Sequence, residues 1–223
     1  MLVCLENVLA TPALQVAYDL LERETFVDGK SSAGEQARRG KNNQELSGGI
    51  PSAKAINNLV MGALVRHPVY LHAGLPKRIA VPFYCRYKKG MGYGSHIDDP
   101  IMGQGEKYRA DIAITIFLNG PEDYEGGELE IETSFGTRKI KANAGDGIMY
   151  PASSRHQVCE VTRGERLVAV TWMQSLVPES DRRELLFQLY QAKEVLRNSD
   201  SQTSATQQVE QSHANLVRMW SQL

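Results

Sequence analysis

The segment Asp111-Ile112-Ala113-Ile114-Thr115-Ile116-Phe117-Leu118 alternates between two kinds of side chain. Its even-numbered positions are all Ile or Leu, and the odd-numbered positions from 113 to 117 are Ala, Thr and Phe. Successive side chains of a β-strand point to opposite faces, so this pattern predicts a strand whose large aliphatic residues share one face. Asn119-Gly120-Pro121 follows, and Gly and Pro favour a turn. The segment therefore predicts one strand that ends at a turn.

Similar short segments lie on both sides of this strand, from about residue 79 to residue 175, with turn residues between them. The other candidate strands are 79–87, 128–132, 138–142, 148–150, 157–161 and 166–173, the last two being joined by a turn over 162–165. Strands that recur roughly every 8–12 residues are typical of a sandwich or jelly roll and not of βαβ units. We therefore expect a jelly-roll core, a double-stranded β-helix, over about residues 79–175.

Helical patterns flank this core. Behind Thr11-Pro12 and behind Pro51, apolar residues recur at helical spacing after a proline at the expected helix start. The same spacing returns after Pro178, in two C-terminal helices that a polar linker over 198–208 separates. We predict a mainly β protein with flanking helices, in which the N-terminal helices pack on the jelly roll. The expected domains are 1–177, which contains the core, and 178–223, a C-terminal helical extension.

The composition excludes several classes of partner. Lys and Arg number 25 against 26 Asp and Glu, a net charge of −1, so electrostatics give no reason to expect nucleic acid or an anionic membrane as partner. Cys4, Cys85 and Cys159 include no Cys-x-x-Cys pair, which is typical of reduced thiols in a cytosolic protein. Glu6 interrupts the apolar N-terminus, and no stretch approaches about 18 apolar residues. We expect a soluble cytoplasmic protein.

The segment from Asp28 to Gly49 is polar and contains glycine. Such a composition usually lies outside a core, so a solvated loop is the favoured interpretation. A flap that faces a substrate is the alternative.

A candidate metal site lies in Tyr93-Gly94-Ser95-His96-Ile97-Asp98-Asp99-Pro100. On an extended segment His96 and Asp98 point to the same side and Asp99 points away. An imidazole and a carboxylate make up half of a facial 2-His-1-carboxylate iron site. The triplet alone is a weak signal, because His-x-Asp also occurs by chance.

His156 and Arg166 follow at the starts of two later candidate strands. Arg166 shares its parity with Val168 and Trp172, which predicts that its side chain faces the interior of the β-structure. A buried guanidinium needs an anionic partner, and a dicarboxylate co-substrate would suit the bidentate geometry of arginine.

Each of these residues has an ordinary interpretation when taken singly. His156 would more often be a surface or core histidine, and Arg166 would form a salt bridge with Glu160 or Glu165. The order His96-x-Asp98, His156, Arg166 on predicted strands favours one shared site instead.

This pattern on a predicted jelly roll resembles the iron(II)- and 2-oxoglutarate-dependent dioxygenases of the prolyl 4-hydroxylase-like superfamily. Over nearly the whole chain, the sequence is most similar to the bacterial PKHD-type hydroxylases. Besides the site itself, the motifs that carry this resemblance are Lys41-Asn42-Asn43-Gln44, Asp123-Tyr124-Glu125-Gly126-Gly127-Glu128-Leu129, Ala144-Gly145-Asp146, Tyr150-Pro151, Val161-Thr162-Arg163-Gly164, Trp172-Met173-Gln174-Ser175-Leu176-Val177 and Asn215-Leu216-Val217-Arg218-Met219-Trp220.

The resemblance implies a function and a role for each site residue. His96, Asp98 and His156 would hold Fe(II), Arg166 would pair with the far carboxylate of 2-oxoglutarate, and Tyr87 would line the co-substrate pocket. The implied reaction is hydroxylation of a substrate by O2, coupled to oxidative decarboxylation of 2-oxoglutarate to succinate. L-ascorbate would act as the reductant that restores Fe(II) after uncoupled turnover.

One position departs from the family pattern. Prolyl hydroxylases often place a second tyrosine near the position of Phe117, where it bonds the same carboxylate. Phenylalanine has no hydrogen-bond donor. Tyr87, a threonine or water would have to supply the bond here.

Several alternatives remain open at the level of sequence. The substrate is either peptidyl or a siderophore-like small molecule, and a link with iron and siderophore uptake is implied by relatives. A non-catalytic jelly-roll sensor of metal or a small acid is one alternative function, and a cupin-type dioxygenase that does not use 2-oxoglutarate is another. The apolar C-terminal helices also predict a homo-oligomer.

Overall fold

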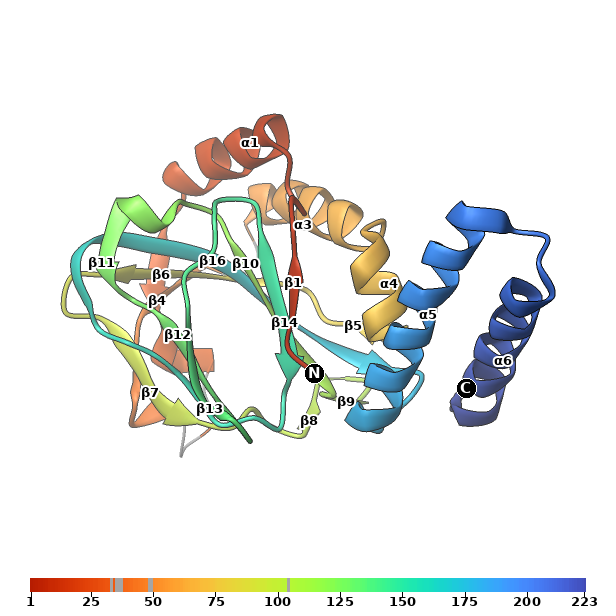
Figure 1. Cartoon of the computed structure of the whole chain (residues 1–223). Helices are drawn as coiled ribbons and strands as arrows, with labels where there is room; N and C mark the ends of the chain where they lie inside the picture. The colour runs from red at the N-terminus through yellow and green to blue at the C-terminus, as the bar shows by residue number, and fades with distance from the viewer. Residues whose placement is uncertain (33, 35–37, 48–49, 104) are drawn as a thin grey trace.

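The chain folds, in a computed structural model, into two antiparallel β-sheets flanked by helices (Figure 1). The structure describes all residues except 33, 35–37, 48–49 and 104. The helices are α1 (Thr11–Glu22), α3 (Pro51–Leu64), α4 (Pro68–Gly74), α5 (Ser180–Asp200) and α6 (Ser204–Trp220), with short 3-10 turns at Gly29–Ser32 and Pro121–Asp123. The prediction of a mainly β protein with flanking helices is confirmed.

The larger sheet has a central path of strands and two additional strands that pair with β16. In spatial order the path is β1 (Val3–Leu5), β14 (Gly147–Pro151), β10 (Ile112–Phe117), β16 (Val161–Ser175), β6 (Phe83–Lys88), β4 (Gln44–Leu46) and β2 (Phe26–Asp28). The additional strands are β5 (Pro76–Ile79) and β11 (Tyr124–Gly126). Helices α1 and α3 lie over the outer face of this sheet (Figure 1).

The smaller sheet faces the larger one and carries the middle of the chain. Its order is β13 (Gly136–Ile140), β12 (Leu129–Thr133), β15 (His156–Val158), β7 (Gly92–His96) and β3 (Lys41–Asn42). A separate hairpin pairs β8 (Ile101–Met102) with β9 (Tyr108–Arg109).

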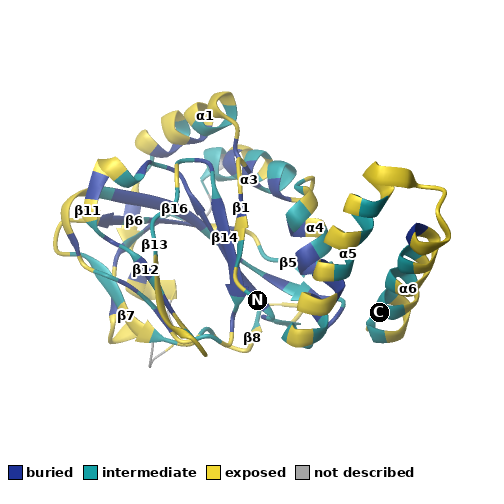
Figure 2. Cartoon of the chain, viewed as in Figure 1, coloured by how far each residue is buried: buried dark blue, intermediate teal, exposed yellow. Residues whose placement is uncertain are grey.

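Strand β10 shows why both faces of the larger sheet are apolar. It lies between β14 and β16, and all six of its residues are buried (Figure 2). Ile112, Ile114 and Ile116 pack in the core beneath the helices, whereas Ala113 and Phe117 pack in a second core between the two sheets. The predicted alternation is confirmed, and the face that carries Ala113 and Phe117 is the one turned to the interior between the sheets.

Strand β16 differs from its prediction. It runs without a break from Val161 to Ser175, where the sequence predicts a turn over 162–165. Gly164 lies inside the strand at φ 74° and pairs with Tyr124 of β11. Glycine adopts this left-handed conformation without the steric cost of a Cβ, so the strand can continue through it.

The solvated-loop interpretation of 28–49 is wrong for its second half. Strand β3 pairs with β7, and β4 pairs with β6. Lys41, Asn43 and Glu45 are only 8%, 3% and 6% exposed, and Lys41 forms a salt bridge with Glu45. The pair neutralises its own charges, which allows a polar segment to lie inside the fold. Residues 33, 35–37 and 48–49 of this segment lie outside the described residues.

The linker predicted over 198–208 is shorter in the structure. Helix α5 continues to Asp200, and α6 begins at Ser204. Thr203 caps α6, since its Oγ1 accepts a hydrogen bond from the backbone N–H of Thr206 at 3.1 Å. Polar residues therefore extend both helices, and α6 lies on the outer side of α5 (Figure 1).

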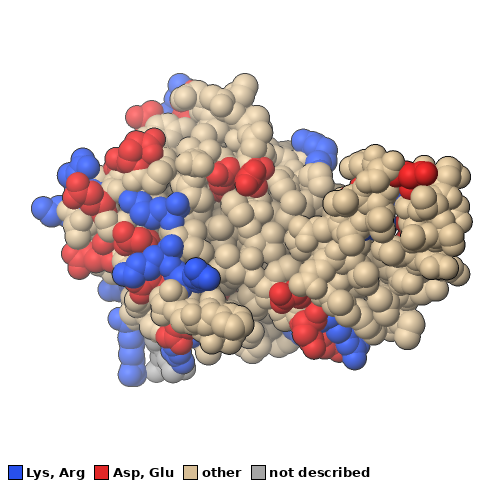
Figure 3. Space-filling view, viewed as in Figure 1, with Lys and Arg blue, Asp and Glu red and all other residues tan. Residues whose placement is uncertain are grey.

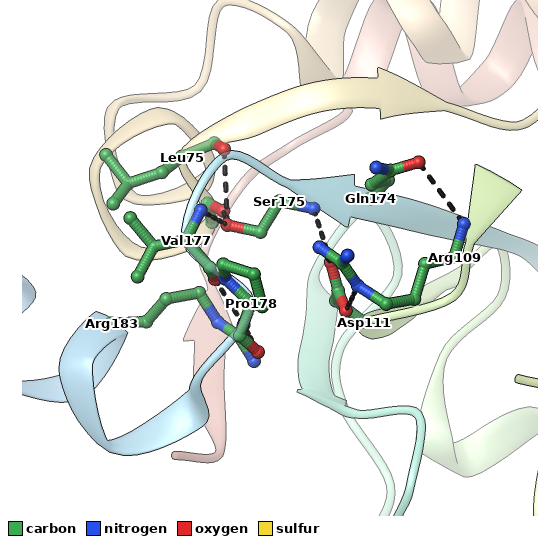
Figure 4. A network of polar contacts seen from close by, with 9 residues as sticks. Leu75, Arg109, Asp111, Gln174, Ser175, Val177, Pro178 and Arg183 are labelled. Carbon is green, nitrogen blue, oxygen red and sulfur yellow. Dashed lines mark hydrogen bonds and ion pairs between the residues drawn. The ribbon is translucent and has the colours of Figure 1, made fainter. Parts of the chain in front are cut away.

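A polar network ties the end of β16 to helix α5 (Figure 4). The Ser175 N–H donates to Asp111 Oδ2 at 2.9 Å, and the Ser175 hydroxyl donates to the carbonyl at the end of α4 at 2.7 Å. Arg183 of α5 is 3% exposed and donates from Nη1 to the carbonyls of Val177 and Pro178, each at 2.7 Å. The helical extension is thus anchored to the sheet by buried hydrogen bonds.

Candidate active site

Strand pairing brings two histidines together. His96 ends β7, His156 begins β15, and the two residues are direct partners in the antiparallel register. Directly opposed residues project to the same face of a sheet. Their ring centroids are 4.2 Å apart, so the topology alone places the two imidazoles side by side.

Asp98 completes the cluster from the loop that follows β7. Its Oδ1 lies 3.8 Å from His96 Nε2 and 3.7 Å from His156 Nε2. One candidate ligand atom from each of the three residues lies within 4.8 Å of the others. The Asp98 side chain is 7% exposed, whereas Asp99 is exposed. The structure therefore brings together the three residues that the sequence singled out, and leaves Asp99 outside.

Both imidazoles are held through the nitrogen that faces away from Asp98. His96 Nδ1 donates to the carbonyl of Gly94 at 2.8 Å, and His156 Nδ1 donates to the carbonyl of Ser154 at 3.0 Å. A carbonyl only accepts, so each Nδ1 carries a proton, and the neutral form of either ring keeps its lone pair on Nε2. These bonds leave two oriented donor atoms beside the carboxylate.

Burial disfavours charge on the cluster. Burial, followed by the neighbouring His156, lowers the pKa of His96 to about 4. Burial raises the pKa of Asp98, against the opposing influence of His156 and of a hydrogen bond from Trp172. Burial therefore disfavours a charge on His96 and on Asp98 when each stands alone, and a cation between the ligand atoms would stabilise the carboxylate.

Trp172 orients the Asp98 carboxylate. Its Nε1 donates to Asp98 Oδ2 at 2.9 Å, which leaves Oδ1 directed toward the two imidazoles. Sequence reasoning assigns Trp172 no role as a ligand or as a support of one. Its shared parity with Arg166 on β16 is the signal that points to the interior.

Tyr93 of the same strand contacts His96, and Lys41 of the neighbouring strand β3 contacts Tyr93. The Tyr93 ring stacks on the His96 ring at 3.8 Å between centroids, and Lys41 Nζ lies 5.5 Å from the Tyr93 centroid. Lys41 is directly opposite Tyr93 in the pairing of β3 with β7. The segment before residue 49 thus contacts the ring that stacks on His96, as in the interpretation that this segment and Tyr93 hold His96 in place.

Arg166 lies inside the fold as its parity predicts. It is 1% exposed and is the direct partner of Tyr87 in the pairing of β16 with β6. Its guanidinium carbon lies 5.1 Å from the Tyr87 ring centroid and 5.4 Å from that of Phe117. Its Nε and Nη1 have no hydrogen-bond partner among the described residues, so neither is used in a salt bridge with Glu160 or Glu165.

The histidine cluster and the arginine line the same interior. Tyr87 and Phe117, which contact Arg166, belong to the core cluster between the sheets, as does Tyr150. The Tyr150 ring centroid lies 5.1 Å from that of His156. The two imidazoles, the carboxylate and the guanidinium therefore border the same interior between the sheets.

Comparison with known proteins decides the family. Residues 82–174 match the family model of the 2OG-Fe(II) oxygenase superfamily. The chain is 42% identical over 221 residues to a PKHD-type hydroxylase of Thioalkalivibrio sulfidiphilus, with 99% of each chain covered. The chain belongs to the PKHD-type hydroxylases. A second PKHD-type hydroxylase, from a Polaromonas strain, is also 42% identical, over 224 residues and 99% of each chain. The resemblance predicted from the sequence is confirmed.

Solved structures confirm the jelly-roll fold of this PKHD-type hydroxylase. A prolyl hydroxylase from Trichoplax adhaerens, in complex with a hypoxia inducible factor peptide fragment, aligns with a TM-score of 0.56 at 17% identity. It covers 77% of this chain and 82% of its own. HygX from Streptomyces hygroscopicus, with nickel, 2-oxoglutarate and hygromycin B bound, aligns with a TM-score of 0.53 at 12% identity, covering 80% and 84%.

Membership of this family makes the chain an enzyme, a hydroxylase of the 2OG-Fe(II) oxygenase superfamily. The family implies Fe(II) and 2-oxoglutarate as its cofactor and co-substrate. The alternative of a non-catalytic sensor is thereby set aside. The cluster of His96, Asp98 and His156 and the buried Arg166 are the groups in this fold that match such chemistry.

Proposed function

We propose that the protein hydroxylates its substrate at an Fe(II) ion held by His96, Asp98 and His156, with Arg166 binding the far carboxylate of 2-oxoglutarate. The observation that carries this proposal is the presence of both elements in one interior: a compact His-Asp-His cluster and a buried guanidinium with unpaired donors. Metal storage alone would require the cluster but not the arginine.

The donor set fits Fe(II). Two imidazole nitrogens and one carboxylate oxygen form the facial triad of non-haem iron oxygenases, which leaves coordination positions free. Nδ1 of each histidine is bonded to a carbonyl, and Trp172 fixes the carboxylate, so the donors are oriented before a metal arrives. The ion would also offset the unfavourable burial of the carboxylate.

The arginine pocket fits a dicarboxylate. An unpaired buried guanidinium costs several kcal/mol, about 3–5 in cases where its partner has been removed. A carboxylate of 2-oxoglutarate would supply the anionic partner that this guanidinium lacks, and arginine favours bidentate pairing with carboxylates. Tyr87, directly opposite Arg166, would line the same pocket.

When bound, Fe(II) would let O2 oxidise 2-oxoglutarate to succinate and CO2 and hydroxylate the substrate, with one oxygen atom entering each product. The contribution of this chain is binding, orientation and the exclusion of water. The side chains of His156 and Asp98 are 6% and 7% exposed, so the reacting atoms would lie in a dry pocket. L-ascorbate would act outside this cycle, as the reductant that restores Fe(II).

The substrate class stays a proposal. One of the structures with this fold is a complex with a peptide fragment, and another has hygromycin B bound. Both a peptidyl substrate and a siderophore-like small molecule therefore suit the fold, with O2 as co-substrate. A role in iron or siderophore uptake follows only from the small-molecule alternative.

Arg166→Gln tests the proposed co-substrate site. We expect the affinity of the Fe(II)-loaded protein for 2-oxoglutarate, measured by anaerobic calorimetry, to fall at least a hundredfold, because the charged hydrogen bonds to the carboxylate are lost. Arg163→Gln is the control, since Arg163 is exposed and pairs with Glu125 outside the pocket. Equal affinity of Arg166→Gln and wild type, or substrate oxidation that does not depend on 2-oxoglutarate, would favour the cupin-type alternative.

A further inference from the structure

The Tyr124 hydroxyl is buried and has no hydrogen-bond partner among the described residues. Tyr124 is 1% exposed, so water does not reach it from the surface. Buried hydroxyls in folded proteins almost always form a hydrogen bond. Nε and Nη1 of Arg166 are likewise buried and without a hydrogen-bond partner among the described residues.

Strand pairing places Tyr124 beside Arg166. Tyr124 of β11 is the direct partner of Gly164, which lies two residues before Arg166 on β16 and therefore on the same face. Diagonal neighbours across a strand pair are within reach of long and aromatic side chains. Burial raises the pKa of the Tyr124 phenol. The positive charge of Arg166 is the largest influence in the opposite direction, which indicates that the two groups lie close together.

The ring of Tyr124 is fixed in this position. Gly127 adopts φ 66°, and a Cβ there would lie 3.0 Å from the Tyr124 ring. On the other side, Lys141 Nζ lies 4.1 Å from the ring centroid and donates to the Tyr124 carbonyl at 2.7 Å. The motif Tyr124-Glu125-Gly126-Gly127, to which the catalytic cluster gives no role, thus presents one phenol to the arginine.

Phe117 leaves this position without a hydrogen-bond donor. Its ring centroid lies 5.4 Å from the guanidinium carbon of Arg166, but the ring forms only an apolar wall. Tyr87 and Tyr124 reach Arg166 from different strands, β6 and β11. The surroundings of the guanidinium therefore include the phenol of Tyr124, which lies on β11, a strand that the sequence did not predict.

We propose that Tyr124 donates a hydrogen bond to the far carboxylate of 2-oxoglutarate, next to Arg166, and so takes the role that Phe117 cannot fill. The inference rests on the proposed function of Arg166. It makes Tyr124 a specificity-determining residue: its hydroxyl favours 2-oxo acids with a carboxylate at the far end over those with a methyl group there.

Tyr124→Phe separates this role from a structural one. Anaerobic calorimetry on the Fe(II)-loaded full-length protein would measure the affinities for 2-oxoglutarate and for 2-oxovalerate, a five-carbon 2-oxo acid with a methyl group in place of the far carboxylate. We expect Tyr124→Phe to weaken 2-oxoglutarate about tenfold and 2-oxovalerate less than twofold. Tyr84→Phe is the matched control, because this buried tyrosine bonds Asn57 in the core beneath the helices.

Thermal unfolding gives a second readout. Tyr124→Phe keeps the ring and its packing against Gly127 and Lys141, so the variant should unfold close to the wild-type temperature. Added 2-oxoglutarate should then raise the unfolding temperature of the wild type more than that of the variant.

The outcomes are distinguishable. If the wild type binds 2-oxoglutarate and Tyr124→Phe binds it equally well, or loses the same factor for both acids, the role of Tyr124 is refuted and the proposed function stands. If the wild type binds no 2-oxoglutarate, the proposed function fails and this inference fails with it.

Discussion

Asp98 and Asp99 are adjacent carboxylates in opposite environments. Asp98 Oδ1 faces both imidazoles at less than 4 Å, whereas Asp99 is exposed. Parity on an extended segment predicts this division, although β7 ends at His96 and Asp98 lies in the loop after it. Asp98 lies only two residues after the end of the strand, and its side chain still points to the same side as that of His96.

Asp98→Ala should therefore abolish stoichiometric Fe(II) binding, and Asp99→Ala should retain it. Removing one of three ligands leaves two imidazoles, which hold Fe(II) far more weakly than the complete triad. Metal content after anaerobic loading and desalting measures the difference. Loss of iron in Asp99→Ala with retention in Asp98→Ala would show that the other carboxylate is the ligand.

Trp172 acts on the metal through Asp98. Trp172→Phe keeps an aromatic ring but removes the Nε1–H that bonds Asp98 Oδ2. We expect Fe(II) affinity to fall about tenfold, the lower end of the effects seen when a supporting bond to a ligand is lost. Trp220→Phe, at the end of α6, provides the control with the other tryptophan of the chain. Equal metal affinities in the two variants would contradict the orienting role.

At the level of residues, sequence reasoning found the groups with unusual chemistry and missed those that support them. His96, Asp98, His156 and Arg166 stand out because imidazoles, a carboxylate and a guanidinium are rare inside a β-core. Tyr124 belongs to a residue type common in cores, so nothing in its identity marks it. Only the register of β11 against β16 places it beside Arg166.

At the level of elements, the close approach of β11 to β16 depends on glycine. Gly164 has φ 74°, and a Cβ there would lie 2.0 Å from the carbonyl oxygen of Asp123. The same backbone conformation occurs at Gly90, with φ 81°, where a Cβ would meet nothing within 4 Å. An alanine at either position would strain the backbone, but only at Gly164 would its Cβ also clash with a neighbouring strand.

Gly164→Ala should lower the free energy of unfolding by about 2 kcal/mol or more, and Gly90→Ala by about 1 kcal/mol. The first variant adds a clash with the neighbouring strand to the strain that both variants share. Urea denaturation followed by circular dichroism measures the two values. Equal losses would mean that β11 does not pack against β16 at this distance.

The elements also show where periodicity fails as a guide. Strand β10 is long, regular and alternating, and its prediction is confirmed. Strands β3, β4 and β11 have two or three residues each, too few for a period to show. Their existence follows from pairing with β6, β7 and β16, which is information that no local pattern contains.

At the level of the whole molecule, charge is distributed without a dominant sign over the face in Figure 3, where basic and acidic side chains are interspersed. A broad uncharged area covers the part of this face near β14, α5 and α6. In the described part of the chain, no helix has both the length and the apolar character that a membrane crossing demands. The expected cytoplasmic location stays a prediction.

The helical extension, α5 and α6, is attached to the rest of the fold by a few specific contacts. Its attachment at Ser175 and Arg183 is buried, and Arg182 lies over the Trp220 ring at 5.4 Å, which holds α6 against α5. The division into domains at residue 177 and self-association through these helices both stay predictions.

Anaerobic absorption spectroscopy of the Fe(II)-loaded protein tests the central claim, that the histidine cluster and Arg166 form one iron and 2-oxoglutarate site. We predict that one equivalent of 2-oxoglutarate produces a visible charge-transfer band in the wild type, and that a pulse of O2 removes it with formation of succinate. In Arg166→Gln the band should require at least a hundredfold more 2-oxoglutarate. Fe(II) binding without any band at saturating 2-oxoglutarate would contradict the account.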